Sequence, residues 1–340
     1  MRDLHQIAIE RQTINDTIRG FFRARGYVEV DTPILVASPD MEPALTPFET
    51  VAIEGDGTKH SAALITSPEY SMKKLLGTGL QKIFTLTHVF RNVEEFGGTH
   101  NPEFTMLEWY QQGADYDACM DETEALVREV VREVEKSTEA PMSRSGLTCF
   151  SPSDPFRRAR VRDLMLEHAG VDLDSAGVSE LREACRRLSL STMDVDTESD
   201  LFYRLFLTQV ESKLIDEPTF VYDYPRHQAA LSRLTPDGKY GKRFELYAGG
   251  LELCNGFSEL TDGVEQRSRF EKERQTRKET GKTMFPIDED LLVLLPYVRQ
   301  PTFGNALGVD RLHMYATGRK KLEDVLLFPA NGLFKSASRS

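Results

Sequence analysis

Two glutamates flank a run of small residues in the segment 244–253, which reads FELYAGGLEL. If this segment is a β-hairpin with a two-residue turn at 248–249, Glu245 lies directly across from Glu252; a turn at 249–250 places them diagonally. Both arrangements put the carboxylates on one face, with about 5 to 8 Å between β-carbons, whereas a three-residue turn would put them on opposite faces. Like charges so close repel each other, and oxygen ligands of this kind suit Mg²⁺. The spacing therefore predicts a magnesium site.

Another carboxylate lies among large apolar groups in the segment FTMLEWY, residues 104–110. Alternate residues of a β-strand share a face, so Phe104, Met106, Glu108 and Tyr110 point the same way. Burying a carboxylate among such neighbours is costly unless a cation meets it. One interpretation is an edge strand with Glu108 in water. The other is a pocket whose acidic base binds an ammonium group.

Glycines precede an expected helix in the segment GNALGVDRL, residues 304–312. Glycine permits a ligand to approach the backbone closely, and Arg311 would lie in the first turn of the helix. The pattern alone is a weak indication of a binding site, because most glycine-rich helix entries are structural.

The composition is that of an acidic, folded chain. Of 340 residues, 40% are hydrophobic and 28% are charged, and the formal net charge is −12. This balance argues against general binding of polyanions, which depends on lysine and arginine. Residues 291–295, the densest apolar run, are far shorter than the roughly 20 residues of a membrane span. We expect no signal peptide, because charged residues interrupt the N-terminal segment. The four cysteines form no CxxC pair, so we expect a cytoplasmic protein without structural zinc.

Helices and strands must position these side chains. Ile7, Ile14, Ile18 and Phe21 recur with a period of about 3.6, which predicts an N-terminal helix that Gly26 ends. The expected strands follow one another through turns, which favours an α+β fold with a mixed, mostly antiparallel sheet flanked by helices. We expect strands at 27–30, 219–224 and 244–253, and strand-like structure over 62–110 with a turn-rich interval at 97–98. The expected helices are at 121–136, 178–188, 201–214, 266–280 and from 310, with a helical insertion over about 140–215.

Several segments, in order along the chain, resemble the motifs of class II aminoacyl-tRNA synthetases. Residues 26–35 resemble motif 1, residues 90–105 resemble motif 2, and residues 306–311 resemble motif 3. The resemblance covers residues 5–317 and implies the catalytic fold of that class. The segments that are similar to its lysyl branch are 66–70, 105–110, 218–225 and 255–260.

Within the lysyl branch, the chain resembles stand-alone paralogues that attach (R)-β-lysine to a protein, elongation factor P. Lysyl-tRNA synthetases carry an N-terminal OB-fold domain that binds the anticodon, whereas the motif 1 helix here begins almost at residue 1. We therefore expect one catalytic domain over 1–330, a tail over 331–340 and no anticodon-binding domain. Ala306 stands where lysyl-tRNA synthetases have glycine and the β-lysine paralogues have alanine. One methyl group contributes only about 1 to 3 kcal/mol to discrimination between substrates, so Ala306 favours the β-lysine paralogues without proving that assignment.

The resemblance implies a two-step reaction that uses ATP and Mg²⁺. The amino acid carboxylate attacks the α-phosphate of ATP, giving an adenylate and pyrophosphate, and a lysine amine of elongation factor P then forms an amide. Motif 1 lies at a two-fold interface in this class, so a homodimer is expected; tRNA and membranes are not expected partners. The alternatives are a truncated lysyl-tRNA synthetase-like enzyme that transfers α-lysine to tRNA or another acceptor, an asparagine synthetase, and a catalytically dead regulatory subunit.

The same resemblance assigns roles to residues. Arg91 would bridge the substrate carboxylate and the α-phosphate, Phe104 and Arg311 would enclose the adenine, and the two arginines are the expected catalytic residues. The family reads Arg-Asn-Glu where residues 91–94 read RNVE, so either Glu94 or Glu95 takes the place of that glutamate. The expected ATP-binding residues are Arg91, Asn92, Glu94, His100, Asn101, Phe104, Glu245, Leu246, Gly308 and Arg311, and Glu245 and Glu252 would hold Mg²⁺. The expected amino acid-binding residues are Ser67, Glu69, Glu108, Tyr110, Glu252, Asn255, Glu259 and Ala306, with Glu69 at the amine near the carboxylate and Glu108, Tyr110 and Glu259 at the distal ammonium.

Overall fold

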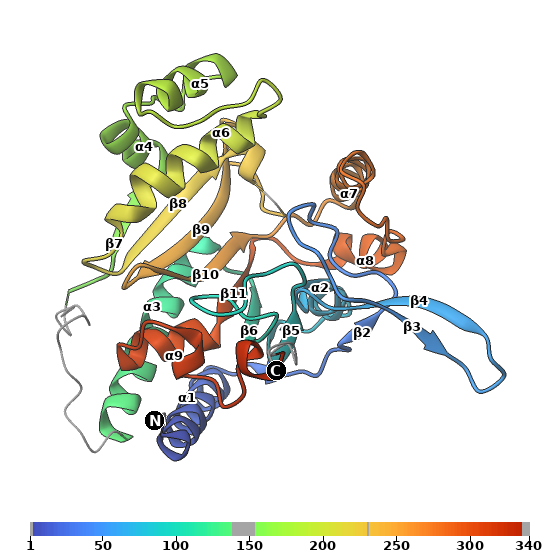
Figure 1. Cartoon of the computed structure of the whole chain (residues 1–340). Helices are drawn as coiled ribbons and strands as arrows, with labels where there is room; N and C mark the ends of the chain where they lie inside the picture. The colour runs from blue at the N-terminus through green and yellow to red at the C-terminus, as the bar shows by residue number, and fades with distance from the viewer. Residues whose placement is uncertain (1–2, 138–153, 230, 335–340) are drawn as a thin grey trace, which may run out of the picture.

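The computed structural model describes residues 3–137, 154–229 and 231–334 (Figure 1). Its main sheet has parallel pairs at both edges and antiparallel pairs between them. This confirms the α+β fold with a mixed, mostly antiparallel sheet. The strand order is β1 (Val28–Glu29), β5 (Lys82–Phe90), β6 (Glu103–Gln112), β11 (Thr302–Gly308), β10 (Leu251–Ser258), β9 (Tyr240–Ala248), β8 (Thr219–Pro225) and β7 (Arg157–Arg160).

Three helices cover one face of this sheet: α1 (Leu4–Ala24), α3 (Tyr116–Ser137) and α9 (Val309–Thr317). The predicted apolar stripe of α1 is buried, and Gly26 follows the helix with a φ of 78° that suits glycine. The ring of Phe22 stacks on Phe84 with centroids 4.9 Å apart, and fully buried Trp109 lies beside it. The main core therefore lies between the sheet and these helices, which leaves the other face of the central strands for a site.

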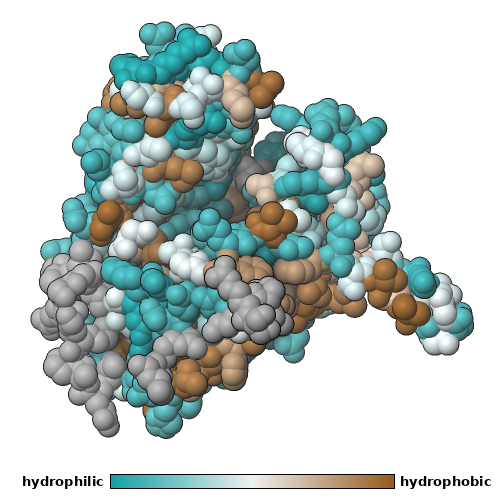
Figure 2. Space-filling model, in the orientation of Figure 1, coloured by the Kyte–Doolittle hydropathy of each residue, from teal (hydrophilic) through white to brown (hydrophobic). Residues whose placement is uncertain are grey.

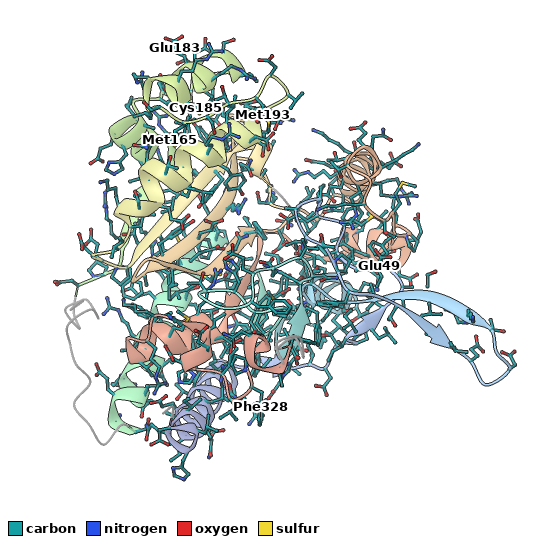
Figure 3. The ribbon with its side chains drawn as sticks, in the orientation of Figure 1. Glu49, Met165, Glu183, Cys185, Met193 and Phe328 are labelled. Atoms are coloured by element: carbon teal, nitrogen blue, oxygen red, sulfur yellow. The ribbon has the colours of Figure 1, made fainter. Side chains whose placement is uncertain are left out.

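A lobe of three helices stands beside β8: α4 (Val161–Ala169), α5 (Val178–Arg187) and α6 (Glu198–Leu205). It has a core of its own, in which Met165 and Cys185 are fully buried (Figure 3). The helices fall within the predicted helical insertion, although residues 140–153 lie outside the described residues. Residues 157–160 correct that expectation, because they pair with β8 as the parallel edge strand β7.

Strand-like structure was expected over 62–110, but residues 91–102 form a loop between β5 and β6, and residues 69–77 form a helix. Residues Glu69–Gly77 form helix α2, whose buried side chains Tyr70, Met72, Lys73 and Leu76 follow a helical rather than an alternating pattern. Helices α7 (Gly263–Glu279) and α8 (Glu289–Leu294) lie nearby, and α10 (Ala330–Leu333) follows α9. The hairpin of β3 (Glu49–Ile53) and β4 (Lys59–Leu64), which β2 (Leu35–Val36) joins in a second sheet, projects from the body (Figure 1).

The loop 40–46 is fixed by basic side chains at the end of α7. Buried Arg277 donates to the carbonyl oxygens of Glu42 and Leu45 at 3.2 and 3.0 Å, and Lys282 donates to that of Pro43 at 2.5 Å. These bonds hold the loop over the free face of the sheet. None of the helices in the described part of the chain is long and apolar enough to cross a bilayer.

Candidate active site

A cavity of about 370 Å³ opens over the centre of the large sheet. Strands β6, β9, β10 and β11 form its floor, and its walls come from the loop 40–45, the start of α2, the loop 91–101 and the segment after α6. Figure 2 shows the surface hollowed between the lobe of α4–α6 and the part that carries α7. The predicted residues that line the cavity are Ser67, Glu69, Arg91, Glu94, His100, Asn101, Phe104, Glu108, Tyr110, Glu245, Glu252, Asn255, Ala306, Gly308 and Arg311.

Strand register brings residues from distant segments into one row. Glu245 in β9 pairs with Asn255 in β10, Asn255 pairs with Ala306 in β11, and Ala306 pairs with Glu108 in β6. Side chains alternate along a strand, so paired residues share a face. The row therefore crosses the cavity floor from one carboxylate to another, with the methyl group of Ala306 beside Glu108.

The hairpin of β9 and β10 turns at Gly249 and Gly250, whose φ angles are 61° and 77°. Glu252 pairs with Tyr247, so Glu245 and Glu252 lie diagonally on one face, which is one of the two predicted arrangements. A β-bulge between Glu252 and Cys254 then shifts the alternation by one residue. Because of this bulge, both Glu252 and Asn255 line the cavity.

Glu245 is held by three protein donors. Arg243 donates to Oε1 at 2.5 Å, and the hydroxyls of Tyr224 and Tyr247 donate to Oε2 at 2.5 and 2.7 Å. Arg243 also donates to Asn255 Oδ1 at 3.1 Å and to the carbonyl oxygen of Gln228 at 2.8 Å. Buried ion pairs depend on such additional hydrogen bonds, since the desolvation of both charges must be offset. Arg243 and Glu245 thus form a braced wall of the cavity.

Glu252 has a different environment. Its side chain is 40% exposed, and its carboxylate lies 3.5 Å from Arg311, which donates instead to the backbone oxygen of Glu252 at 2.9 Å. Burial in the cavity wall and the neighbouring Glu245 carboxylate raise the pKa of Glu252 to about 7. Arg311 also lies 3.4 Å from the imidazole of His100. Glu252 is therefore less constrained by protein donors than Glu245 is.

Arg91 lies over the ring of Phe104, with its guanidinium carbon 5.2 Å from the ring centroid. Its Nε is buried and has no hydrogen-bond partner within the described ranges. Val93 takes the extra position in the loop with a φ of 61°, and its side chain is exposed. This backbone places Glu94 in the cavity wall and leaves Glu95 outside it, which favours Glu94 over Glu95.

An acidic pocket forms the other end of the cavity. Lys73 Nζ contacts Glu69 Oε1 at 2.5 Å and Glu259 Oε2 at 2.6 Å, and Tyr110 donates to Glu108 Oε1 at 2.7 Å. Burial, and then the charge of Glu69, raise the pKa of Glu108 well above its usual value. Burial also raises the pKa of Glu259, to about 7, although Lys73 opposes this. A cation bound beside these carboxyls would favour their ionised form and offset the cost of burying it.

Gly304 lies under Tyr110 and Glu259 in that pocket. A β-carbon at Gly304 would lie 2.2 Å from the ring of Tyr110 and 2.3 Å from Glu259 Oε1. Glu259 itself does not line the cavity, and the absence of a side chain at Gly304 is what lets its carboxylate and the Tyr110 ring pack against the backbone of β11. The glycine in the expected helix entry thus has a specific steric role.

Two predicted ATP-binding residues are not brought to the cavity. The side chain of Leu246 is fully buried on the opposite face of β9, in the main core. Strand alternation directs this side chain away from Glu245, so only the backbone of Leu246 is left to contact ATP. Asn92 is exposed and does not line the cavity. Its backbone N–H donates to the carbonyl oxygen of Thr46 at 2.7 Å.

Other residues of the site were missed from the sequence. Lys73 follows Glu69 by four residues, and this helical spacing was the available signal. Arg243 and Tyr247 lie two residues on either side of Glu245, on the same strand face. Phe257 follows Asn255 in the same way and also lines the cavity.

Asp310 connects the cavity to the N-terminal helix. One of its oxygens accepts from Arg11 of α1, and the other accepts from the amide of Thr105 in β6 at 2.9 Å. Thr105 follows Phe104 in the chain, and Arg311 follows Asp310. The buried Asp310 therefore fixes β6 and α9 relative to each other beside the two side chains expected to enclose adenine.

The site fits a nucleoside triphosphate with Mg²⁺. The unpartnered Nε of Arg91 and the half-exposed guanidinium of Arg311 are donors suited to phosphate. The oxygens of Glu252 accept no side-chain hydrogen bond from the described residues and can bind the metal. Oε1 of Glu245 accepts one hydrogen bond, from Arg243, and has a lone pair left for a further ligand. The described residues contain no group of three or more histidine, cysteine, aspartate or glutamate side chains able to hold a metal. Phosphate and water ligands would therefore complete the shell, as is usual for Mg²⁺.

Three features define a class II synthetase site. They are an antiparallel floor, Arg91 in the loop after β5, and Arg311 in the first turn of α9, the helix that follows β11. The chain belongs to the family described as tRNA synthetases class II (D, K and N), whose sequence model matches residues 1–332. Among curated proteins, it is 41% identical over 328 residues to the elongation factor P–(R)-β-lysine ligase of Yersinia enterocolitica, a match that covers 94% of each chain. Ligases of the same name from Salmonella typhi and Edwardsiella ictaluri are each 40% identical, again over 94% of both chains.

Proposed function

We propose that this chain is an ATP-dependent ligase that activates (R)-β-lysine as an adenylate and transfers it to a lysine side chain of elongation factor P. The observation that carries the proposal is one cavity with two opposite ends. The acidic pocket of Glu69, Glu108 and Glu259 suits the two ammonium groups of a lysine-type amino acid, and Arg91 and Arg311 suit phosphate. The names of the curated relatives support the substrate and the acceptor.

In the first step, a carboxylate oxygen of the amino acid attacks the α-phosphorus of ATP, and the bond to the β-phosphate oxygen breaks to release pyrophosphate. Two anions must come together, so the protein contributes mainly positioning and charge neutralisation. Arg91 would contact both the carboxylate and the α-phosphate, and Arg311 and Phe104 would enclose the adenine. Glu252, with Glu245, would hold the Mg²⁺ that neutralises the phosphates.

In the second step, the neutral amine of the acceptor lysine attacks the carbonyl carbon of the adenylate. An amide forms, AMP leaves, and the amine loses a proton. Neither step needs a nucleophilic side chain of the enzyme. The acceptor amine must enter the cavity from its open side.

Ala306 supports (R)-β-lysine as the amino acid. Its methyl group lies on the cavity floor between Asn255 and Glu108. (R)-β-Lysine carries its amine one carbon further from the carboxylate than α-lysine does, and the methyl group is placed to distinguish the two. A single methyl group gives about 1 to 3 kcal/mol of discrimination.

The test supplies purified chain with MgATP, elongation factor P and either (R)-β-lysine or α-lysine, and measures the mass of the acceptor. We expect the mass of one lysyl group to be added, much faster with (R)-β-lysine. Equal rates or a preference for α-lysine would reject the amino acid assignment. Label transferred to tRNA instead of protein would identify the truncated synthetase-like alternative.

We infer three further properties. Residues 1–330 act as one catalytic domain, since the strands of one sheet come from residues 28 to 308. The chain forms a homodimer through the segment 26–35, in which Val28, Ile34 and Leu35 are exposed apolar residues; a monomer in light scattering would contradict this. The enzyme works in the cytoplasm, where its acceptor acts in translation.

A further inference from the structure

Lys73 reaches the acidic pocket from outside the cavity. It lies one turn after Glu69 in α2, its side chain is only 3% exposed, and its ammonium contacts both Glu69 and Glu259. Glu69 lines the cavity, whereas Lys73 does not. The lysine therefore joins carboxylates from two distant parts of the chain without occupying the space of a ligand.

The joined carboxylates keep acceptors for a ligand. Glu108 Oε2 and Glu259 Oε1 are buried and have no hydrogen-bond donor in the parts of the chain that the structure describes. Buried acceptors without donors are costly, so these two oxygens call for donors from a bound molecule. Gly304 has no side chain, so the Glu259 carboxylate and the Tyr110 ring pack close to its backbone.

The charges in the pocket are unequal. Glu69, Glu108 and Glu259 together with Lys73 leave two negative charges in excess when all are ionised. Burial disfavours the charged lysine, but the Glu259 and Glu69 carboxylates outweigh burial and raise the pKa of Lys73, which stays charged. Without this ammonium, Glu69 and Glu259 would repel each other and lose their common support.

We propose that Lys73 is a positioning residue for the amino acid: it holds Glu69 and Glu259 in place and offsets one of their charges, so that the pocket matches a substrate with two ammonium groups. The inference rests on the proposed function and adds the residue that sets the charge of its substrate pocket. Lys73 contacts neither the nucleotide end of the cavity nor Arg91, so its effect is confined to the amino acid.

The test compares K73M with K74M in ATP–pyrophosphate exchange that depends on (R)-β-lysine. Lys74 is the matched control, because it is the next residue of α2 and pairs with Asp288 at 2.7 Å outside the cavity. We expect K73M to raise KM for (R)-β-lysine about 100-fold and to change KM for ATP by less than about threefold. K74M should leave both constants within about threefold.

Equal KM values for the amino acid in K73M and K74M would overturn the inference, and so would a parallel rise for ATP. If K73M does not fold, K73R replaces it: the bulkier guanidinium should raise KM for (R)-β-lysine about tenfold, and an unchanged KM would overturn the inference. A wild-type chain without exchange would reject the proposed function instead. Calorimetric binding of (R)-β-lysine to wild type and K73M would then still test Lys73, and equal affinities would overturn its role.

Discussion

Arg243 donates a hydrogen bond of 2.5 Å to the carboxylate of Glu245, its neighbour on the same face of β9. Together with the two tyrosine donors, this bond uses most of the acceptor capacity of Glu245. Glu252 in the adjacent strand accepts no side-chain hydrogen bond from the described residues at normal distance. Two glutamates that are equivalent in the sequence pattern thus differ in what they can offer a ligand.

E252Q is expected to lower the affinity for Mg²⁺ more than E245Q does. Removing the freer carboxylate should raise the Mg²⁺ concentration for half-maximal ATP–pyrophosphate exchange about tenfold. E245Q should act mainly by loosening Arg243, which lowers the free energy of unfolding. A Mg²⁺ titration and a urea titration of both variants measure these effects, and identical profiles would contradict the distinction.

R243M should destabilise the fold. The substitution leaves the Glu245 carboxylate buried without its ion pair, which costs about 3 kcal/mol in the free energy of unfolding. The matched control is K242M, since Lys242 is the preceding residue, lies 5.6 Å over the ring of Tyr116 and does not line the cavity. Its loss should cost less than about 1 kcal/mol. Urea titration of both variants checks the prediction, which an R243M midpoint equal to that of K242M would refute.

The ligand-free chain should lose stability as pH rises from about 5 to 8. Burial, followed by the charge of Glu69, raises the pKa of Asp40 to about 7, and burial with Asp40 raises that of Glu273 to about 8. Glu252 and Glu259 are raised to about 7 as well. The folded chain therefore retains protons in this range that the unfolded chain has released, so rising pH favours unfolding.

Below about pH 5 the dependence of stability on pH is opposite, and stability falls as pH falls. Burial opposes ionisation of Glu10, but hydrogen bonds from His313 and Arg319 lower its pKa to about 2, so its contribution is lost as pH falls. Thermal unfolding as a function of pH should thus show a maximum near about pH 5. D40N should flatten the alkaline decline, and a wild-type stability that rises toward pH 8 would contradict the prediction.

G304A should displace side chains of the acidic pocket. The new methyl group would lie 2.2 Å from the Tyr110 ring and 2.3 Å from Glu259 Oε1, so one of them must move. We expect KM for the amino acid to rise about 100-fold. The control is G20A in α1, where a β-carbon meets no atom within 4 Å; it should stabilise the helix slightly. Steady-state kinetics measure both, and a normal KM in G304A would show that the pocket lies elsewhere.

A306G should reduce the preference for (R)-β-lysine. Removing the methyl group between Asn255 and Glu108 should shift the ratio of kcat/KM toward α-lysine by about tenfold. A52G in the projecting strand β3 serves as control, since it lies outside the cavity lining. Exchange assays with the two isomers give the ratio, and no change in A306G would remove the methyl group from the account of specificity.

Local patterns predicted much of the site because they depend on one element at a time. The alternation around Glu108 and the shared face of Glu245 and Glu252 follow from strand geometry and short turns. What could not be predicted depends on contacts between elements or on a change of period. The bulge after Glu252 has no sequence signature of its own, and the helical start at Glu69 was overlooked within a strand-rich region. The bridge of Lys73 to Glu259 joins residues 186 positions apart, a contact that no local rule supplies.

The carboxylate of Asp310 fixes the distance between the backbone segments that carry Phe104 and Arg311. Phe104 is carried by the strand on one side of it and Arg311 by the helix on the other, while Arg11 anchors it from α1. If adenine binds between Phe104 and Arg311, as proposed, the width of the gap between them depends on the position of α1. A shift of α1 would then narrow or widen this gap without any change in the residues that line it.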